Sequence, residues 1–252
     1  SAAVRSAMKD IYQKGLALGN NPHAFSKVGD CHTSHVWFMH QFGGQYSYNL
    51  GQYTNLKGVI DWFSTPNDFS DNNSFLRTSQ AARSGFVSAS VLDPLWKADQ
   101  SLCPKGESPL RCEYRIHKPS VAIIQFGILD PDFLTTGDFQ ASMTAIVDQS
   151  LALGVIPVVS TAPINPVYPD KARQFNRFVI QLAQSRNIPY IDLASVLDFL
   201  PNHGLDVDNL HMTPAAHFGG IEFAGPSLNT GLTLWNLLAL DSLNSVWQQI
   251  MT

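Results

Sequence analysis

The chain has 252 residues, of which 44% are hydrophobic and 14% are charged, and its formal net charge at pH 7 is −4. This length suits one large α/β domain or two small ones, and we expect one domain with a sizeable core. No apolar run approaches the eighteen or so residues of a membrane span, and no basic block indicates a nucleic-acid surface. Composition therefore favours a soluble protein with no membrane span and no nucleic-acid partner.

The chain begins with a predicted helix and a predicted strand. Apolar side chains at helical spacing, Val4, Met8, Ile11 and Leu16, predict a helix over 2–18 that "GNNP" terminates, so residues 1–20 form a helical lead-in. The first strand is expected at about 24–28. Residues 43–79 are rich in Gly, Asn, Ser, Tyr and Phe, and within them only "LKGVIDWF" is typical of a helix. We expect this stretch to be long, ordered and irregular.

From residue 120 the pattern becomes regular. Strands are predicted at "SVAIIQFG", "VIPVVSTA" and "IPYIDLA", and helices at 139–153, 171–186 and about 232–250. Continuous apolar strands that alternate with amphipathic helices predict a parallel sheet covered on both faces, a three-layer α/β/α sandwich. No repeat or linker divides the chain, so residues 1–252 are expected to form a single domain. Ligands bind such sheets beyond the carboxyl ends of the strands.

Cysteine usage indicates the compartment. Cys103 and Cys112 bracket "PKGESPLR", a Gly- and Pro-containing loop that can bring the two sulfurs together. We expect a disulfide here and an extracellular or cell-surface protein; the alternative is three reduced thiols in a cytosolic chain. The chain starts at Ser1 without an initiator Met, which favours a processed product. "NNS", from Asn72 to Ser74, matches a glycosylation sequon.

Two reactive groups lie far apart in sequence but at the expected carboxyl edge of the sheet. Asp30 and Cys31 follow the first strand, and "VDNLHMTP" places Asp208 three residues before His211. At that spacing a carboxylate can hold an imidazole in one tautomer. His211 would then take the proton of Cys31, and Asp208 would stabilise the imidazolium.

In these segments the sequence resembles the SGNH (GDSL-type) hydrolase family, from about residue 25 to residue 211. The serine nucleophile of the family falls on Cys31 in "GDC", and the glycine of its second block falls on Gly85 in "AARSGFVSAS". The Asp-x-x-His block is matched in full by Asp208 and His211. The resemblance implies the SGNH hydrolase fold, with a parallel, flavodoxin-like sheet, and no cofactor.

The Gly-x-Asn-Asp block of the family is only partly matched. It falls on "GILD", where Gly127 and Asp130 match and Leu129 stands at the position of the asparagine that donates to the oxyanion. Loss of one such donor typically lowers turnover by about 10²–10³. By the resemblance, backbone amides of Cys31 and Gly85 would hold the oxyanion alone, with Asp30, Gly127 and Asp130 in support.

Other interpretations of these residues stay open at this stage. Cys31 can be a small buried hydrophobe at a strand end, and Asp208 can cap an ordinary surface turn. "CHTSH" has a spacing that metal ligands use, but structural zinc needs four ligands and a second Cys/His pair is missing, so we expect no metal site. Several aromatic side chains can line a groove or pack in the core: Trp37, Phe38, Tyr46, Tyr48, Tyr53, Trp62 and Phe63.

Two functions are consistent with this sequence. The first is a secreted hydrolase or acyl transferase that acts on an ester, thioester or O-acyl group of a small molecule or carbohydrate through Cys31, His211 and Asp208. The second is a catalytically degenerate protein of the same fold that serves as a binding module or as a self-associating subunit of an extracellular assembly. The intact Asp–His pair favours the first, and the two changed signature residues favour the second.

Overall fold

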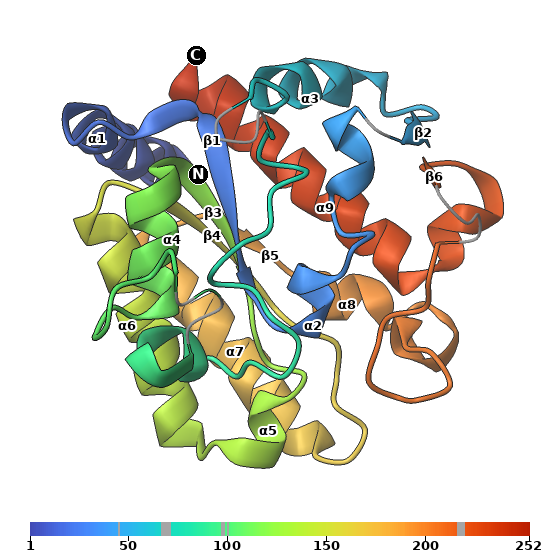
Figure 1. Cartoon of the computed structure of the whole chain (residues 1–252). Helices are drawn as coiled ribbons and strands as arrows, with labels where there is room; N and C mark the ends of the chain where they lie inside the picture. Colours follow the sequence, from blue (N-terminus) through green and yellow to red (C-terminus); the bar gives the residue numbers. More distant parts are fainter. Residues whose placement is uncertain (45, 67–71, 97–98, 100, 216–219) are drawn as a thin grey trace.

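The computed structural model describes residues 1–44, 46–66, 72–96, 99, 101–215 and 220–252 (Figure 1). Its centre is a parallel sheet of four strands in the order β1-β3-β4-β5. These are β1 (Asn21–Gly29), β3 (Pro119–Gln125), β4 (Ile156–Ser160) and β5 (Tyr190–Ile191). In register, Val28 lies beside Ile124, and Ile124 beside Val159. All residues of β3 and β4 are buried, as continuous apolar runs between two helical layers require.

Helices cover both faces of this sheet (Figure 1). One face carries α4 (Pro109–His117), α6 (Thr136–Ala152) and α7 (Pro169–Arg186), and the other carries α3 (Lys57–Phe63) and α9 (Gly231–Val246), which a π-helical turn (Trp247–Met251) extends. Phe139 and Phe175 stack between α6 and α7 with ring centroids 4.0 Å apart. The expected three-layer α/β/α sandwich is confirmed.

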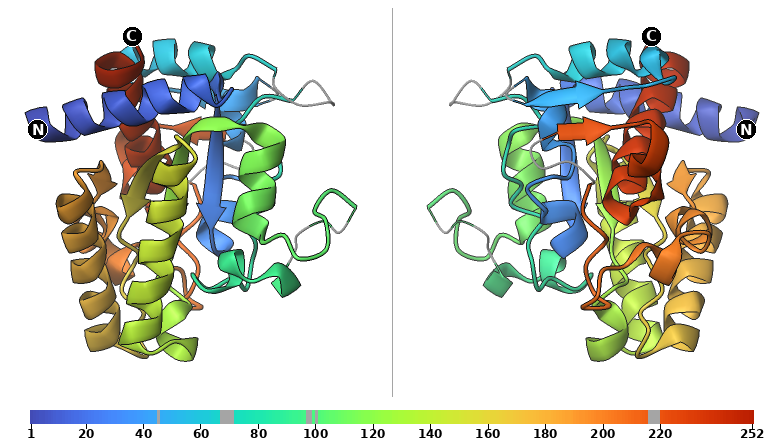
Figure 2. Two further views of the ribbon diagram at one scale, coloured as in Figure 1. Left: turned by 90° about the vertical axis from the view of Figure 1, so that its left-hand side faces the viewer. Right: turned by 90° about the vertical axis from the view of Figure 1, so that its right-hand side faces the viewer.

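The helix α1 (Ala2–Ala17) packs at the amino end of the sheet, away from the carboxyl ends of the strands (Figure 2). Ser1 caps it, and Met8 and Tyr12 are buried. Asn20 then ties the chain to the turn before β4 by donating to the carbonyls of Leu153 and Gly154. The helix expected from the apolar spacing is confirmed, and Leu16, one of the residues in that spacing, is 38% exposed.

No regular strand of the described chain borders the outer edge of β1. Residues 73–83, the edge segment, run along it instead. Ser74 Oγ accepts from the Phe25 amide at 3.0 Å, and Ser79 Oγ donates to the Lys27 carbonyl at 2.6 Å. At the end of β1, Gly29 donates to the Ala81 carbonyl at 3.0 Å. Side-chain hydroxyls thus satisfy much of an edge that would otherwise present unpaired backbone groups.

Several sequence expectations need correction in detail. The region 43–79 contains a short strand, β2 (Ser47–Asn49), which pairs in parallel with β6 (Gly220–Glu222). The strand expected at "IPYIDLA" is only β5, because α8 (Leu193–Leu197) begins two residues later. The helix α4 was not expected, although Ser108 caps it and Pro109 occupies its first turn.

The disulfide between Cys103 and Cys112 is present, as expected, with Cα atoms 5.4 Å apart. In the sequon Ser74 is buried and hydrogen-bonded to β1, while Asn72 is partly exposed. Within the described residues, no helix combines the length and the hydropathy needed to cross a bilayer.

Candidate functional site

Cys31 is the first residue of α2 (Cys31–Ser34), directly beyond the carboxyl end of β1. Asp30 caps this helix, its Oδ1 accepting from the His32 amide at 3.0 Å. The helix can lie against the sheet because position 29 is glycine: a Cβ there would come within 2.5 Å of Thr33 Oγ1. The sequence therefore presents Cys31 at the edge of the sheet where ligands of open α/β folds bind.

Asp208 and His211 form a bonded pair in the segment between α8 and α9. His211 Nδ1 and Asp208 Oδ2 are 2.6 Å apart, and Asp208 Oδ1 accepts from the backbone amides of Leu210 and His211 at 2.9 Å. The hydrogen bond to His211 and these two amides lower the pKa of Asp208 to about 2. Asp208 therefore both closes the turn and orients the imidazole, and the catalytic interpretation of this pair stays a prediction.

His32 joins this segment to the helix of Cys31. Its Nε2 lies 2.9 Å from the carbonyl oxygen of Leu210, and its ring centroid lies 6.3 Å from that of His211. Burial lowers the pKa of His32 to about 4 and raises the pKa of Asp30 to about 8. Both groups are thus mostly neutral at pH 7, and their 3.9 Å approach is not an ion pair. Neutral His32 donates from Nε2 to Leu210 and holds the His211 turn against α2.

The environment of Cys31 keeps its thiol protonated. Its side chain is 5% exposed, and burial, with the carboxyl of Asp30 and the more distant charge of Asp208, raises the pKa of the thiol above its usual value. A preformed thiolate at neutral pH is therefore excluded, and any reaction at Cys31 must remove its proton during attack.

Gly85 lies in an exposed turn just after the edge segment. Its φ of 87° is one that favours glycine, and a Cβ on it would meet nothing within 4 Å, so backbone conformation rather than space selects the residue. Three residues on, the Ser88 amide donates to Asp130 Oδ1 at 2.7 Å, which ties this turn to the loop after β3. Asp130 thus has a positioning role in the structure.

The loop after β3 holds the other residues of the "GILD" segment. Gly127 has a φ of 130°, and a Cβ there would lie 3.0 Å from that of Ala162, so only glycine fits. Leu129 is half-buried and precedes the short helix α5 (Asp130–Phe133) without a side-chain cap. A leucine side chain has no hydrogen-bond donor, so the side chain at position 129 supplies none to an oxyanion.

The aromatic side chains singled out from the sequence mainly pack together. Phe38 stacks on Trp235 of α9 at 4.8 Å, and Trp62 lies 5.9 Å from Trp247. Tyr53 packs edge-on against Phe223 at 6.2 Å. These contacts pack side chains between residues 38 and 62 against α9, the π-helical turn after it and the segment after β6, in agreement with the packing interpretation of these residues.

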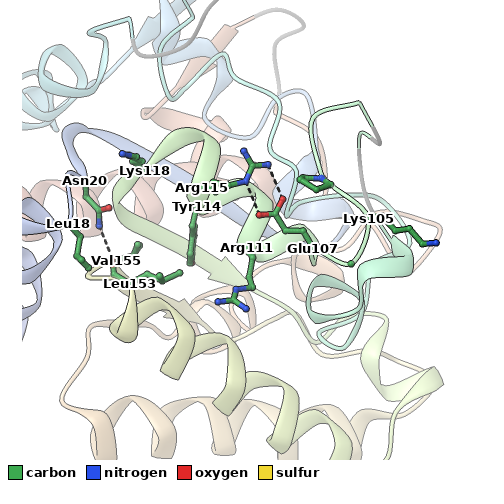
Figure 3. Close-up of a pocket in the computed structure, with 12 residues that line it drawn as sticks. Leu18, Asn20, Lys105, Glu107, Arg111, Tyr114, Arg115, Lys118, Leu153 and Val155 are labelled. Atoms are coloured by element: carbon green, nitrogen blue, oxygen red, sulfur yellow. Dashed lines mark hydrogen bonds and ion pairs between the residues drawn. The ribbon is translucent and has the colours of Figure 1, made fainter.

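A hollow of about 670 Å³ lies far from this constellation (Figure 3). It is lined by Asn20, Lys118 and Val155, which precede β1, β3 and β4, and so it opens at the amino end of the sheet. Arg115 and Glu107 lie side by side in its lining and form a two-pronged ion pair with N···O distances of 2.8 and 2.9 Å. Its position separates it from Cys31 and His211.

No model of a protein family matches the sequence, and no curated protein matches it either. Solved structures do match the fold. A GDSL-like lipase from Bacteroides thetaiotaomicron aligns with a TM-score of 0.53 and 11% identity over 95% of this chain and 98% of that chain. An esterase, EstA, from Pseudoalteromonas sp. aligns with a TM-score of 0.51 and 16% identity, covering 90% and 99%. The chain has the SGNH (GDSL-type) hydrolase fold. An acetyl xylan esterase from Geobacillus stearothermophilus is similar to the same extent, with a TM-score of 0.53, 13% identity and coverage of 89% and 95%.

Within this SGNH fold, sequence reasoning missed two positioning residues. From the sequence, His32 was considered only as a metal ligand. In the structure its Nε2 is hydrogen-bonded to the Leu210 carbonyl. Asn165, in the loop after β4, donates to the Ile128 carbonyl and to Asp132 Oδ2, both at 2.8 Å, and so braces the "GILD" loop. The available signal for Asn165 was a polar residue in the loop that follows a buried strand. For His32 the signal was its place next to Cys31.

Proposed function

We propose that the protein is an SGNH-type hydrolase or acyl transferase that cleaves an ester or O-acyl bond with Cys31 as nucleophile, His211 as base and Asp208 as the residue that orients His211. The observation that carries this proposal is the 2.6 Å bond between His211 Nδ1 and Asp208, in a turn that His32 docks on the helix of Cys31. With Nδ1 held by the carboxylate, Nε2 is the ring atom that accepts the proton of the nucleophile.

The reaction follows from the protonation states of these groups. His211 Nε2 takes the thiol proton as the sulfur of Cys31 attacks the carbonyl carbon, and the carbonyl oxygen becomes an oxyanion that the amides of Cys31 and Gly85 hold. Collapse breaks the ester bond, and His211 returns its proton to the leaving alkoxide. The resulting thioester on Cys31 then transfers its acyl group to water or to an acceptor hydroxyl, which His211 deprotonates, and His211 returns this proton to the departing Cys31 thiolate.

The substrate class is an acyl ester, and an O-acylated carbohydrate is the favoured form. One structural neighbour is named as an acetyl xylan esterase, and others as a lipase and an esterase. The buried disulfide between Cys103 and Cys112 supports an extracellular or cell-surface location for this chain.

A second candidate is a catalytically inactive member of the fold that serves as a binding module or self-associating subunit. Leu129 and the 5% exposure of Cys31, with its raised thiol pKa, favour it. Both features weaken nucleophilic catalysis while leaving the fold intact.

Restoring the family residues separates the two candidates. If the native chain is a cysteine enzyme, it hydrolyses short-chain O-acyl esters, Cys31→Ser lowers turnover, and Cys31→Ala abolishes it. If the protein is a catalytically inactive member of the fold, the native chain does not hydrolyse these esters, and the double change Cys31→Ser with Leu129→Asn introduces hydrolysis. Inert protein in all folded forms contradicts the hydrolase proposal.

A further inference from the structure

A cavity of about 350 Å³ opens beside the helix that carries Cys31. Residues 33–36, from α2 and its end, line one side of it, and residues 76–79 and 82–84 line the other. The second set belongs to the edge segment and to the turn that leads into Gly85. The cavity thus lies against both segments that the proposed function assigns to the nucleophile and the oxyanion hole, and its volume suits a small ligand group.

The lining of this cavity is cationic although the chain has a net charge of −4. Lys27, Arg77 and Arg83 line it as the cations, and His35 and His40 line it as side chains whose pKa burial lowers. Among the lining residues that the structure describes, none is Asp or Glu. A concentration of cations in a concave site on an otherwise acidic protein favours an anionic ligand.

One of the cations that line the cavity, Lys27, is buried and hydrogen-bonded, unlike charges that lie on an open surface. It extends from β1, is 9% exposed, and its Nζ donates to the Phe75 carbonyl at 3.1 Å. Burial and the nearby charge of Arg77 lower the pKa of Lys27 to about 8, and Glu113 opposes this shift. With that pKa the ammonium is still mostly protonated at pH 7. A positive charge that is costly to bury is therefore held at the cavity wall.

The neighbouring donors are fixed by their own contacts. Arg77 Nη2 donates to the Phe25 carbonyl at 2.7 Å and lies 3.6 Å from Glu113 Oε1, so its guanidinium is held against β1. His35 Nδ1 accepts from the Trp37 amide at 3.1 Å. Because burial, with the charge of His211, lowers the pKa of His35, its ring is neutral and carries its proton on Nε2, as a donor.

We propose that this cavity binds an oxyanion, a carboxylate or a phosphate group, on the molecule whose acyl ester is attacked at Cys31. Ammonium and guanidinium groups recognise such oxyanions through charge-assisted hydrogen bonds. The substrate is then an acidic O-acylated molecule, such as an acylated sugar that carries a carboxylate or a phosphate. The link to Cys31 rests on the proposed function, whereas anion binding in the cavity stands independently of it.

Binding of inorganic phosphate and of malonate tests the site directly. Calorimetry against chloride at equal ionic strength should show one saturable site on the native chain. Lys27→Met, which keeps the length of the side chain, should weaken binding about tenfold or more, the effect of a lost charge-assisted contact. Arg83→Gln removes an exposed charge without disturbing the core and should weaken binding in the same direction. Arg111→Gln, in the separate hollow at the amino end of the sheet, is the matched control and should leave affinity unchanged.

Equal affinity in the native chain, Lys27→Met and Arg83→Gln, no binding at all, or loss of binding in Arg111→Gln would overturn the proposal. The preference between phosphate and malonate identifies the type of oxyanion.

A pair of matched acetyl esters, one with a free carboxylate and one with that carboxylate methylated, separates the anion-site proposal from the proposed function. Turnover that favours the carboxylate and loses this preference in Lys27→Met supports the site. Anion binding without turnover of either ester contradicts the proposed function alone, and turnover with no preference contradicts the substrate assignment.

Discussion

Replacing Glu113 by glutamine tests the buried polar cluster that holds the edge segment against β1. Glu113 lies on α4 and is fully buried. Ser26 Oγ donates to its Oε1 at 2.6 Å, and the Gln80 amide donates to its Oε2 at 2.8 Å. Arg77 Nη2 lies 3.6 Å away. The carboxylate therefore joins α4, β1 and the segment that leads to Gly85.

The magnitude follows from these contacts. In Glu113→Gln one of the two acceptor oxygens becomes an amide donor that faces another donor, and Arg77 and Lys27 lose the buried negative charge opposite them. Removing one partner of a buried ion pair costs about 3–5 kcal/mol of unfolding free energy. For a chain of this size that corresponds to a fall in Tm of roughly 6–20 °C.

Urea unfolding followed by circular dichroism measures this free energy, and an unchanged m-value shows that the two states are comparable. Glu107→Gln is the matched control, since Glu107 pairs with the half-exposed Arg115 and should cost only about 0–1 kcal/mol. A loss below about 1 kcal/mol in Glu113→Gln, with Glu107→Gln equal to it, would refute the view that this carboxylate holds the edge segment in place.

Three further predictions concern the cysteines and Asp30. Because the thiol pKa of Cys31 is raised, its alkylation by iodoacetamide should be slow near pH 7 and rise steadily into the alkaline range; a plateau near neutral pH would contradict this. Thiol counting on the unfolded, unreduced chain should find one free thiol, and reduction of Cys103–Cys112 should cost roughly 2–3 kcal/mol, whereas three free thiols would show no bridge. Burial raises the pKa of Asp30 to about 8 from its ordinary 3.8, so between these values the folded chain binds more protons than the unfolded chain and stability falls as pH rises. In Asp30→Asn the free energy of unfolding should fall less steeply as pH rises. The same pH dependence as in the native chain would contradict the assignment of this effect to Asp30.

The strands and long helices were predictable because each satisfies a local rule. β3 and β4 are continuous apolar runs, and α6 and α7 have amphipathic spacing, so the sequence pattern and the tertiary environment agree. The pairing of β2 with β6 was not predictable, since it joins two three-residue segments that are far apart in sequence and have no apolar alternation. The helix α4 was not predicted, although Ser108 and Pro109 mark its start, because its buried face includes the polar residues Glu113 and His117 and so shows no apolar periodicity.

The position of the candidate site could be predicted, but its chemistry could not. The chain order placed Cys31 beyond β1, and the spacing of Asp208 and His211 predicted their bond. Sequence patterns treat charged residues as surface, so the burial of Asp30 and Lys27 gave no signal. The burial of Cys31 itself is the main cause of its raised thiol pKa, and the buried Lys27 places a charge at the wall of the cavity beside it. The assignment of the catalytic and oxyanion-hole roles stays a prediction.

Trapping of an acyl group on Cys31 tests the central claim most directly. The chain is mixed with p-nitrophenyl acetate at neutral pH, quenched in acid within milliseconds to seconds, and mapped by peptide mass spectrometry. The account expects an acetyl thioester at Cys31 that forms far more slowly in His211→Ala than in the native chain. Acetylation that never reaches Cys31, or that reaches it at the same rate in His211→Ala, would contradict the assignment of Cys31 and His211 as nucleophile and base.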